Sequence, residues 1–195
     1  VTGEGYRWKN VGVMANKGIE LSADGDVIRT RDFTWNVSAN VSYNQNRLKE
    51  LYNGVTEYVN STTGLKYVVG HSVSEFFLNR YAGVNPANGE QLWYDKDGNV
   101  TNEFRESDKV MTGKTYDAPW MGGFGTSFRW KGLQLSAQFS WIGTRYVINN
   151  DRYFEESGVT FGTAYNQSNR LLYDRWKQPG DITDIPRWGE VTQLD

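Results

Sequence analysis

The segment WNVSANVSYN, residues 35–44, alternates apolar and polar side chains without exception. Its apolar positions are Trp35, Val37, Ala39, Val41 and Tyr43, and Asn or Ser occupies every position between them. Successive side chains of a β-strand point to opposite faces of the sheet. The pattern therefore predicts a strand with one apolar and one polar face, but it does not say which solvent each face meets.

Two long hairpins are predicted from the same period of two. A short polar break, RTRD, joins the first pair of strands, and Lys131 and Gly132 join the second pair. Connections this short are typical of antiparallel neighbours. The four expected strands cover about residues 17–28, 33–45, 121–130 and 133–146.

Two long segments, residues 46–120 and 148–195, follow the two hairpins. Loops in compact domains have a median length of about 4 to 6 residues, so connections of this length are usually functional or carry structure of their own. Short strands are expected at Phe76–Tyr81 and Gln91–Tyr94, and an amphipathic helix at Asn169–Lys177. Short turns thus alternate with long loops, which places the turns on one side and the loops on the other.

Composition excludes several classes of function. Lys and Arg total 21 against 23 for Asp and Glu, so nothing indicates a nucleic-acid partner. The absence of cysteine excludes disulfides, thiolate metal sites and cysteine nucleophiles, and the single histidine, His71, excludes multi-histidine zinc sites. No apolar run approaches the roughly 18 residues of a membrane helix. We expect no cofactor.

Three features favour a barrel in a lipid bilayer over a water-soluble sandwich. The polar positions of the long strands are Asn, Ser and Gln rather than Lys, Glu and Thr, as suits a crowded polar interior. The strands reach the roughly 9 to 11 residues that cross a bilayer. Aromatic residues gather at the strand ends, as in the girdles of outer-membrane barrels: Phe33, Trp35, Phe128 and Trp130 near the turns, and Tyr43, Trp141 and Tyr146 at the opposite ends.

This interpretation assigns a solvent to each face. The side chains expected to face lipid are Trp35, Val37, Ala39, Val41, Tyr43, Phe128, Trp130, Leu133, Leu135, Phe139 and Trp141. Those expected to face the lumen are Asn36, Ser38, Asn40, Ser42, Gln134, Ser136, Gln138 and Ser140. Strands can cross a membrane only in a closed barrel, and four strands cannot close one, so we expect an all-β chain that supplies about four strands to a larger transmembrane β-barrel.

An ordered set of motifs resembles one family. The motifs are NVGVMANKGIEL (residues 10–21), FTWNVSANVSYNQNRL (33–48), YAGVNPANGEQLWYDKDGN (81–99), APWMGGFGTSFRWKGLQLSAQFSWIGTRYV (118–147) and WKQPGDITDIPRWG (176–189). Together they resemble the late part of the barrel in SusC/RagA-type TonB-dependent outer-membrane transporters. No single motif is decisive, but their order along most of the chain is specific.

The resemblance implies a location, partners and a function. It implies the bacterial outer membrane, a plugged barrel of roughly 22 strands and a SusD-like lipoprotein that caps it. The cargo would be an oligosaccharide or a peptide, with energy arriving from TonB through regions outside this chain and no enzymatic activity. The family's signal sequence, TonB box, plug and final strands have no counterpart here, and Asp195 is not the terminal aromatic of a last strand. We therefore expect an internal stretch of the barrel.

Several polar motifs have ordinary explanations. DKDGN, residues 95–99, resembles a calcium loop but lacks the closing acid, and a turn explains it better. The acidic pairs Glu155–Glu156 and Asp181–Asp184 have no nucleophile in a recognisable motif, so solvated loop charge is expected. The Asn-x-Ser/Thr matches include two inside a spanning strand and are set aside.

Loop aromatics are candidates for contact with cargo or cap. They are Trp93, Tyr94, Tyr153, Trp176 and Trp188. Each could instead pack inside its own loop. Two other classes of protein remain open at this stage. One is a secreted carbohydrate-binding β-sandwich, and the other is an outer-membrane porin or adhesin that works without TonB.

Overall fold

The computed structural model describes residues 10, 12–60, 65–156 and 166–189 of the 195-residue chain. The chain divides into two compact units. The first comprises Val1–Phe76 with Gly113–Tyr146, and the second Phe77–Thr112 with Val147–Asp195. Each unit therefore combines segments that are distant in sequence.

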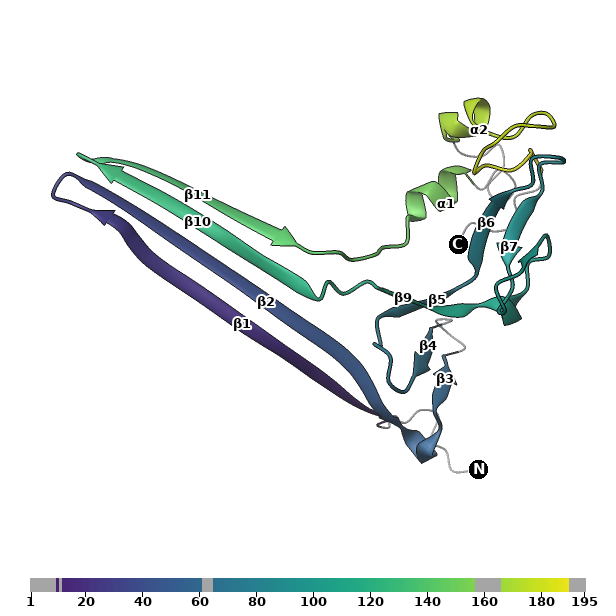
Figure 1. Cartoon of the computed structure of the whole chain (residues 1–195), viewed down its shortest axis with the longest axis horizontal. Coiled ribbons are helices and arrows are strands. Elements are labelled where there is room, and N and C mark those ends of the chain that lie inside the picture. The colour runs from purple at the N-terminus through teal and green to yellow at the C-terminus, as the bar shows by residue number, and fades with distance from the viewer. Residues whose placement is uncertain (1–9, 11, 61–64, 157–165, 190–195) are drawn as a thin grey trace, which may run out of the picture. The chain divides into compact units, whose positions relative to one another are not determined.

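A four-stranded antiparallel sheet dominates the first unit (Figure 1). Its strands, in the spatial order β1-β2-β10-β11, are β1 (Gly12–Arg29), β2 (Phe33–Leu51), β10 (Trp120–Trp130) and β11 (Leu133–Ile142). β1 and β2 are longer than the ranges expected from sequence, whereas β11 ends at Ile142 rather than near Tyr146. The backbone of Tyr146 instead donates to Thr115 O at 3.0 Å, so Tyr146 lies outside the strand.

The strand register places all four apolar sets on one face. Phe124 of β10 pairs with Ala39 of β2 on one side and with Phe139 of β11 on the other. The rings of Phe124 and Phe139 stack with centroids 4.6 Å apart. One residue further, Gly125 pairs with Ser38 and Gln138 on the opposite face. The alternation of each strand is therefore in phase with its neighbours, and the sheet has one apolar and one polar face.

Aromatic rings form a cluster at each end of the four-stranded region. Phe128 stacks on Trp35 at 5.7 Å and lies 6.3 Å from Phe33 near the turns. At the other end Trp120 lies 4.7 Å from Tyr43. β10 spans the two clusters in 11 residues, which matches the roughly 9 to 11 residues of a membrane strand. β1 and β2 continue past the second cluster as a two-stranded ribbon.

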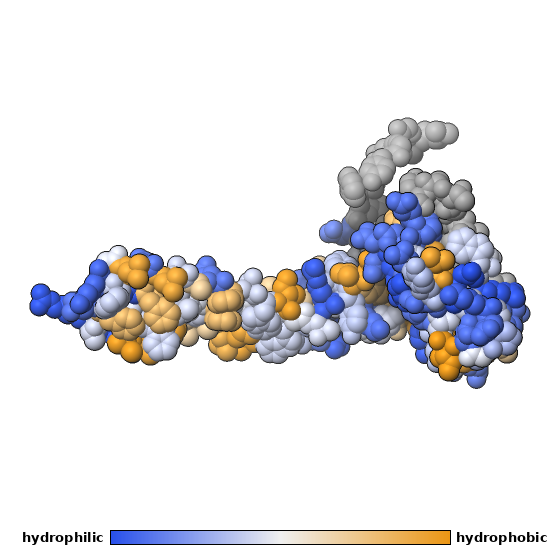
Figure 2. Space-filling model, turned by 90° about the horizontal axis from the view of Figure 1, so that it is seen from above, coloured by the Kyte–Doolittle hydropathy of each residue, from blue (hydrophilic) through white to orange (hydrophobic). Residues whose placement is uncertain are grey.

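The apolar face is exposed. Leu133, Leu135 and Phe124 are 67%, 66% and 52% accessible, and no sheet in the described part of the chain covers them. Figure 2 shows hydrophobic residues gathered over the long strands. A soluble β-sandwich would bury these side chains in its core. The described part of the chain thus does not form a two-layer sandwich over this face.

Short elements extend the first unit beyond the long strands. A 3₁₀ helix, Tyr52–Gly54, follows β2, and β3 (Glu57–Val59) pairs with β4 (Lys66–Val68). Leu48 N donates to His71 O at 2.8 Å, which ties the segment after β4 to the end of β2. β5 (Glu75–Leu78) pairs with β9 (Val110–Thr115), and the boundary between the units falls within this ribbon.

The second unit is built from the two long segments. Its elements are β6 (Arg80–Val84), β7 (Gln91–Tyr94), β8 (Val100–Thr101), a 3₁₀ helix (Glu106–Asp108), α1 (Asn150–Glu156) and α2 (Asn169–Tyr173). Trp93 is 2% exposed and lies edge-on to Tyr81 and Phe104, at 5.2 and 5.0 Å. Leu171 and Ile185 are also buried. The unit therefore has a small core of its own.

The expected loop elements occur with altered bounds. The strand at Gln91–Tyr94 is present as β7, whereas the one expected at Phe76–Tyr81 is divided at Asn79 into β5 and β6. The side-chain amide of Asn79 donates to Arg105 O at 2.8 Å instead of continuing a strand. The expected helix ends at Tyr173, because Lys177 N donates to Asp181 Oδ2 at 2.9 Å and belongs to a turn. No helix among the described residues is long and apolar enough to cross a membrane.

Candidate functional site

The apolar face leaves few polar atoms without a partner. Thr126 is the residue with a hydroxyl in the middle of this face, and Trp35 Nε1 donates to its Oγ1 at 2.9 Å. Thr126 Oγ1 in turn lies 3.5 Å from Asn36 O. An unpaired indole N–H or hydroxyl in hydrocarbon would cost free energy. The pairing therefore makes the face compatible with an apolar solvent.

Glycine and small polar side chains line the middle of the opposite face. A Cβ atom added to Gly125 would lie 2.7 Å from Ser38 Oγ, so a larger residue there would require the Ser38 side chain to move. Nearer the turns the face becomes charged, with Arg29 and Arg129 beside a hollow of about 260 Å³. Asp26 pairs with Arg29 at 3.5 Å and accepts from Asn36 Nδ2 at 3.2 Å. This face can line a hydrated interior.

Two arginines and two carboxylates hold the second unit together. Arg152 of α1 donates to Glu156 at 2.7 Å and to Asp184 at 2.8 Å. Arg170 of α2 donates to both oxygens of Glu156, at 2.8 and 3.0 Å, and to both oxygens of Asp184, at 2.9 Å. The side chain of Glu156 is 6% exposed and that of Asp184 54%. We call these four residues the arginine–carboxylate network.

The network changes the ionisation of one of its own members, Asp184, and of the neighbouring Tyr81. Partial burial raises the pKa of Asp184, but hydrogen bonds from Arg152 and Arg170 outweigh it and hold the pKa below the ordinary value of 3.8. Burial, reinforced by the charge of Asp184, raises the pKa of Tyr81 to about 12. Tyr81 stays protonated and its hydroxyl donates to Asp184 O at 3.1 Å. β6 is thereby joined to residues 174–189, which we call the late loop.

The lowered pKa of Asp184 predicts acid sensitivity. Its contribution to stability is present above the unfolded value of about 3.8 and is lost as the pH falls through the lower folded value. In the full-length protein, pepsin should cleave the segment 174–189 faster as the pH falls from 4 to 2. Asp184→Asn should be cleaved rapidly across this range. An equal pH profile for both proteins would contradict the assignment.

The late loop also packs on the turn between β6 and β7. Trp176 Nε1 donates to Pro86 O at 3.1 Å, and Arg187 N donates to Gly89 O at 2.9 Å. Gly89 has φ +77°, and a Cβ atom there would lie 2.5 Å from the ring of Trp176. Glycine is therefore required for both its backbone conformation and the close approach of the indole.

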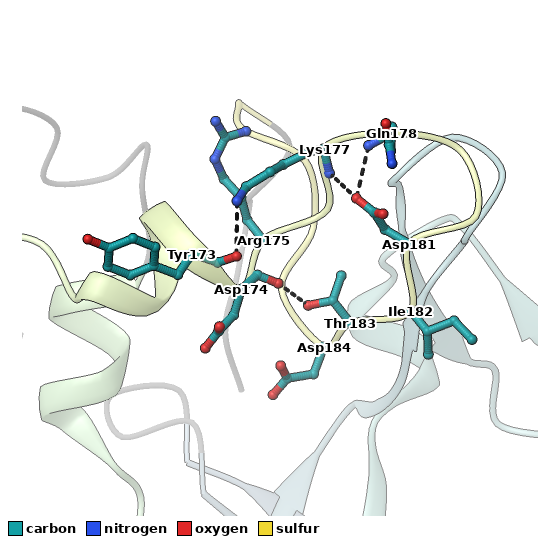
Figure 3. A pocket seen from close by; sticks show the side chains of 9 residues that line it. All are labelled: Tyr173, Asp174, Arg175, Lys177, Gln178, Asp181, Ile182, Thr183 and Asp184. Carbon is teal, nitrogen blue, oxygen red and sulfur yellow. Dashed lines mark hydrogen bonds between the residues drawn. The ribbon is translucent and has the colours of Figure 1, made fainter.

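Two hollows flank α2 on the surface of this unit. The first, of about 690 Å³, is lined by residues from Tyr173 to Asp184 and contains both cationic and anionic side chains (Figure 3). The second, of about 460 Å³, lies between Leu171, Leu172 and Trp188. Large apolar side chains are exposed here: Leu172 at 59%, Tyr173 at 68%, Ile182 at 95% and Trp188 at 56%. We call these four residues the α2 surface.

The five loop aromatics chosen from sequence have different surroundings. Trp93 is buried in the core of the unit, so internal packing explains it and it is not retained as a contact candidate. Trp176 packs on the β6–β7 turn, Tyr94 lies 5.4 Å beneath the guanidinium of Arg80, and Tyr153 lies edge-on to Phe154 at 5.4 Å. Trp188 is the most exposed of the five aromatic residues, and it stays the strongest candidate for contact with cargo or cap.

The polar groups that the sequence offered as possible metal ligands form hydrogen bonds within the protein. Asp95 Oδ1 accepts from the backbone of Asp97 and Asn99, and its Oδ2 from the Asn99 amide at 3.0 Å. These hydrogen bonds, led by the Asn99 side chain, hold the pKa of Asp95 below its ordinary value. His71 Nδ1 lies 2.9 Å from Glu75 Oε2. No group of three metal-binding side chains occurs among the residues that the structure describes.

Sequence reasoning missed the arginine–carboxylate network. It treated Glu156 and Asp184 as solvated loop charges, but Glu156 is buried and both accept from two arginines. A local signal existed, since Arg152 and Glu156 are four residues apart, the spacing of an ion pair on a helix. No comparable sequence spacing indicated that Arg170 and Asp184 would contact that pair.

Known proteins with similar sequences are TonB-dependent receptors. The chain is 25% identical over 92% of its length to "TonB-dependent receptor P3" of Formosa agariphila, of which it covers 19%. It is 27% identical over 83% of its length to "TonB-dependent receptor SusC" of Bacteroides thetaiotaomicron, of which it covers 17%. The chain thus spans about a fifth of the length of these curated relatives. No family model matches it.

Solved structures give a likeness over the whole chain. A structure of the RagAB peptide transporter matches 100% of the chain and 22% of its own chain, with a TM-score of 0.87 and 32% identity. The RagAB peptide importer in its open-open state matches 96% of the chain and 20% of its own, with a TM-score of 0.86 and 34% identity.

The sheet with one exposed apolar face, together with these matches, defines a class of protein: the β-barrel of a TonB-dependent receptor in the bacterial outer membrane. Within that class the chain belongs to the SusC/RagA-type transporters, and it corresponds to about four antiparallel strands of their barrel with the long loops that follow them. The resemblance inferred from sequence motifs is confirmed.

Proposed function

We propose that this chain forms part of the wall and outer loops of a nutrient importer, which takes up oligosaccharides or peptides across the outer membrane and catalyses no reaction. The observation that carries the proposal is the match along the entire chain to a peptide transporter, at 32% identity. The exposed apolar face supports it, because hydrocarbon is a solvent in which such a face is stable.

The proposal divides the work among three surfaces. The apolar face, centred on Val37 and Phe124, contacts lipid, and the polar face, centred on Ser38 and Gln138, lines the interior. The long loops contact the cargo and a SusD-like lipoprotein that caps the barrel. Energy comes from TonB through parts of the transporter outside this chain.

The α2 surface is the proposed contact for the cap. The buried core of a protein interface is more apolar than its rim, and Trp and Tyr are enriched at the positions that contribute most binding energy. Here Ile182 and Trp188 are exposed on a loop that the arginine–carboxylate network and Trp176 hold in place. A loop positioned in this way loses little conformational entropy when a partner binds.

Double replacement of Ile182 and Trp188 by Ser tests the proposal in the full-length transporter. We expect association with the cap lipoprotein to weaken at least about tenfold, the usual consequence of removing an interface hot spot, and uptake of cargo to fall with it. Barrel assembly should not change. The matched control is Val100→Ser, which removes another exposed apolar side chain of the same unit. Normal association and uptake in the double variant would count against a role in docking.

A further inference from the structure

The apolar face contains a hollow of about 520 Å³ over β1, β2 and β10. The rings of Trp35 and Phe124 border it, and smaller side chains such as Ala23 and Ala39 lie between them. Ala23, Ala39 and Phe124 occupy one row across the three strands, so the depression follows from small residues beside a large one. The surface is a recess and not a uniform wall.

The indole N–H and the hydroxyl that the apolar face presents at this hollow are already paired. Trp35 Nε1 donates to Thr126 Oγ1 at 2.9 Å, and this oxygen lies 3.5 Å from the carbonyl of Asn36. Most residues that line the hollow are apolar or glycine, and the polar residues Asp24 and Ser38 belong to the row of the opposite face. Hydrocarbon fits such a lining, whereas a polar ligand would lose its hydration without gaining hydrogen bonds.

Two cations lie at the turns that end these strands. Lys131 Nζ lies 5.6 Å from the ring centroid of Trp130, which belongs to the apolar face. Lys131 N donates to Asp32 O at 3.1 Å, so the two turns are neighbours and Arg31 lies in the adjoining one. Among the residues that the structure describes, none forms an ion pair with Arg31 or Lys131. The Asp32 carboxylate is the nearby opposing charge, which leaves an excess of positive charge.

The spacing of the cations and the hollow matches one leaflet of a bilayer. Trp35 and Ala39 lie three and seven residues after Asp32. At about 3.3 Å per residue, and with the usual tilt of about 40°, these positions lie roughly 8 to 18 Å below the turn. Half of the hydrocarbon core is about 15 Å thick. A lipid whose headgroup lies at the turn would therefore reach the hollow with its acyl chains.

We propose that the hollow between Trp35 and Phe124, together with Arg31 and Lys131, is a binding site for an anionic phospholipid. An acyl chain fills the hollow, and the phosphate lies between the two cations. The excess positive charge selects an anionic headgroup over a zwitterionic one. This inference rests on the proposed orientation of the apolar face toward lipid, and it adds a specific lipid and its contacts.

Native mass spectrometry of the full-length transporter tests the site. The protein would be purified from equimolar phosphatidylglycerol and phosphatidylethanolamine, and its retained lipid measured. We expect the wild type to retain phosphatidylglycerol preferentially. The double variant Arg31→Gln and Lys131→Gln should retain it about 25-fold less, since each basic side chain near an anionic surface contributes about a fivefold attraction. Ala39→Phe, which fills the hollow, should reduce retention of both lipids.

Lys96→Gln is the control, because Lys96 is an exposed cation in a turn of the second unit. Circular dichroism and uptake are measured on every variant to verify the fold. Equal retention of the two lipids by the wild type, or unchanged retention in both the turn variant and Ala39→Phe, overturns the site. If the lipid site is overturned while uptake of cargo is normal, the importer proposal is unaffected. The importer proposal fails separately if the wild-type protein takes up no cargo.

Discussion

Val37→Arg is expected to destabilise the folded barrel by about 2 to 4 kcal/mol, the cost of a cation on the lipid face near the midplane. Val37 pairs with Thr126, close to the middle of the region bounded by the aromatic clusters at Trp120 and Trp130. Leu135→Arg lies one row of this face nearer the turns and should cost less, because the side chain can reach the interface. Equilibrium unfolding of the full-length barrel in phospholipid vesicles measures the change in unfolding free energy for both variants.

Gln138→Arg is the matched control for these substitutions. Gln138 is also near the middle of the sheet, where it pairs with Gly125 on the polar face. If that face lines a hydrated interior, the new guanidinium stays solvated and the free energy of unfolding should change by less than about 1 kcal/mol. Equal losses for Val37→Arg and Gln138→Arg would show that the two faces do not meet different solvents.

Arg170→Met is expected to open the late loop of the second unit. The substitution leaves the buried carboxylate of Glu156 with Arg152 as its one cation in the arginine–carboxylate network. Removing one partner of a buried ion pair costs about 3 to 5 kcal/mol. Because the Arg170 side chain is 37% exposed, we expect a smaller value of about 2 kcal/mol. Trypsin should then cleave after Arg175 or Lys177 about 30-fold faster in the full-length protein.

The double variant Glu156→Leu and Arg170→Met separates the charge effect from loss of packing. Replacing a whole buried ion pair by apolar residues is often neutral, so at least half of the lost protection should return. The interaction free energy follows from the double-mutant cycle. Additive effects of the two substitutions would contradict a network in which Arg170 neutralises Glu156.

Much of the four-stranded sheet was predictable because the face on which each side chain lies depends only on neighbouring residues. The alternation from Trp35 to Tyr43 requires only that neighbouring side chains point to opposite faces, and the pairing of Phe124 with Ala39 and Phe139 shows the same face in the structure. The all-β barrel class and the SusC/RagA type are confirmed. The solvent assigned to each named side chain stays a prediction, which the arginine substitutions test.

Strand ends were less predictable than strand centres. β2 continues to Leu51 and β11 stops at Ile142, although neither end has a break in local composition as clear as RTRD. The end of β2 depends on partners, since Leu48 bonds to His71 from beyond the next hairpin. A strand end set by long-range hydrogen bonds leaves no mark in the alternation itself.

The sequence by itself determined the four-strand wall, its two unlike faces and, through ordered motifs, the transporter family. The tertiary structure alone decided that the two long segments join in one unit, that Trp93 is core while Trp188 is surface, and that Arg170 bridges Glu156 and Asp184. The physical reason is range: a strand's faces follow from successive residues, whereas burial and ion pairing in loops depend on which distant segments meet.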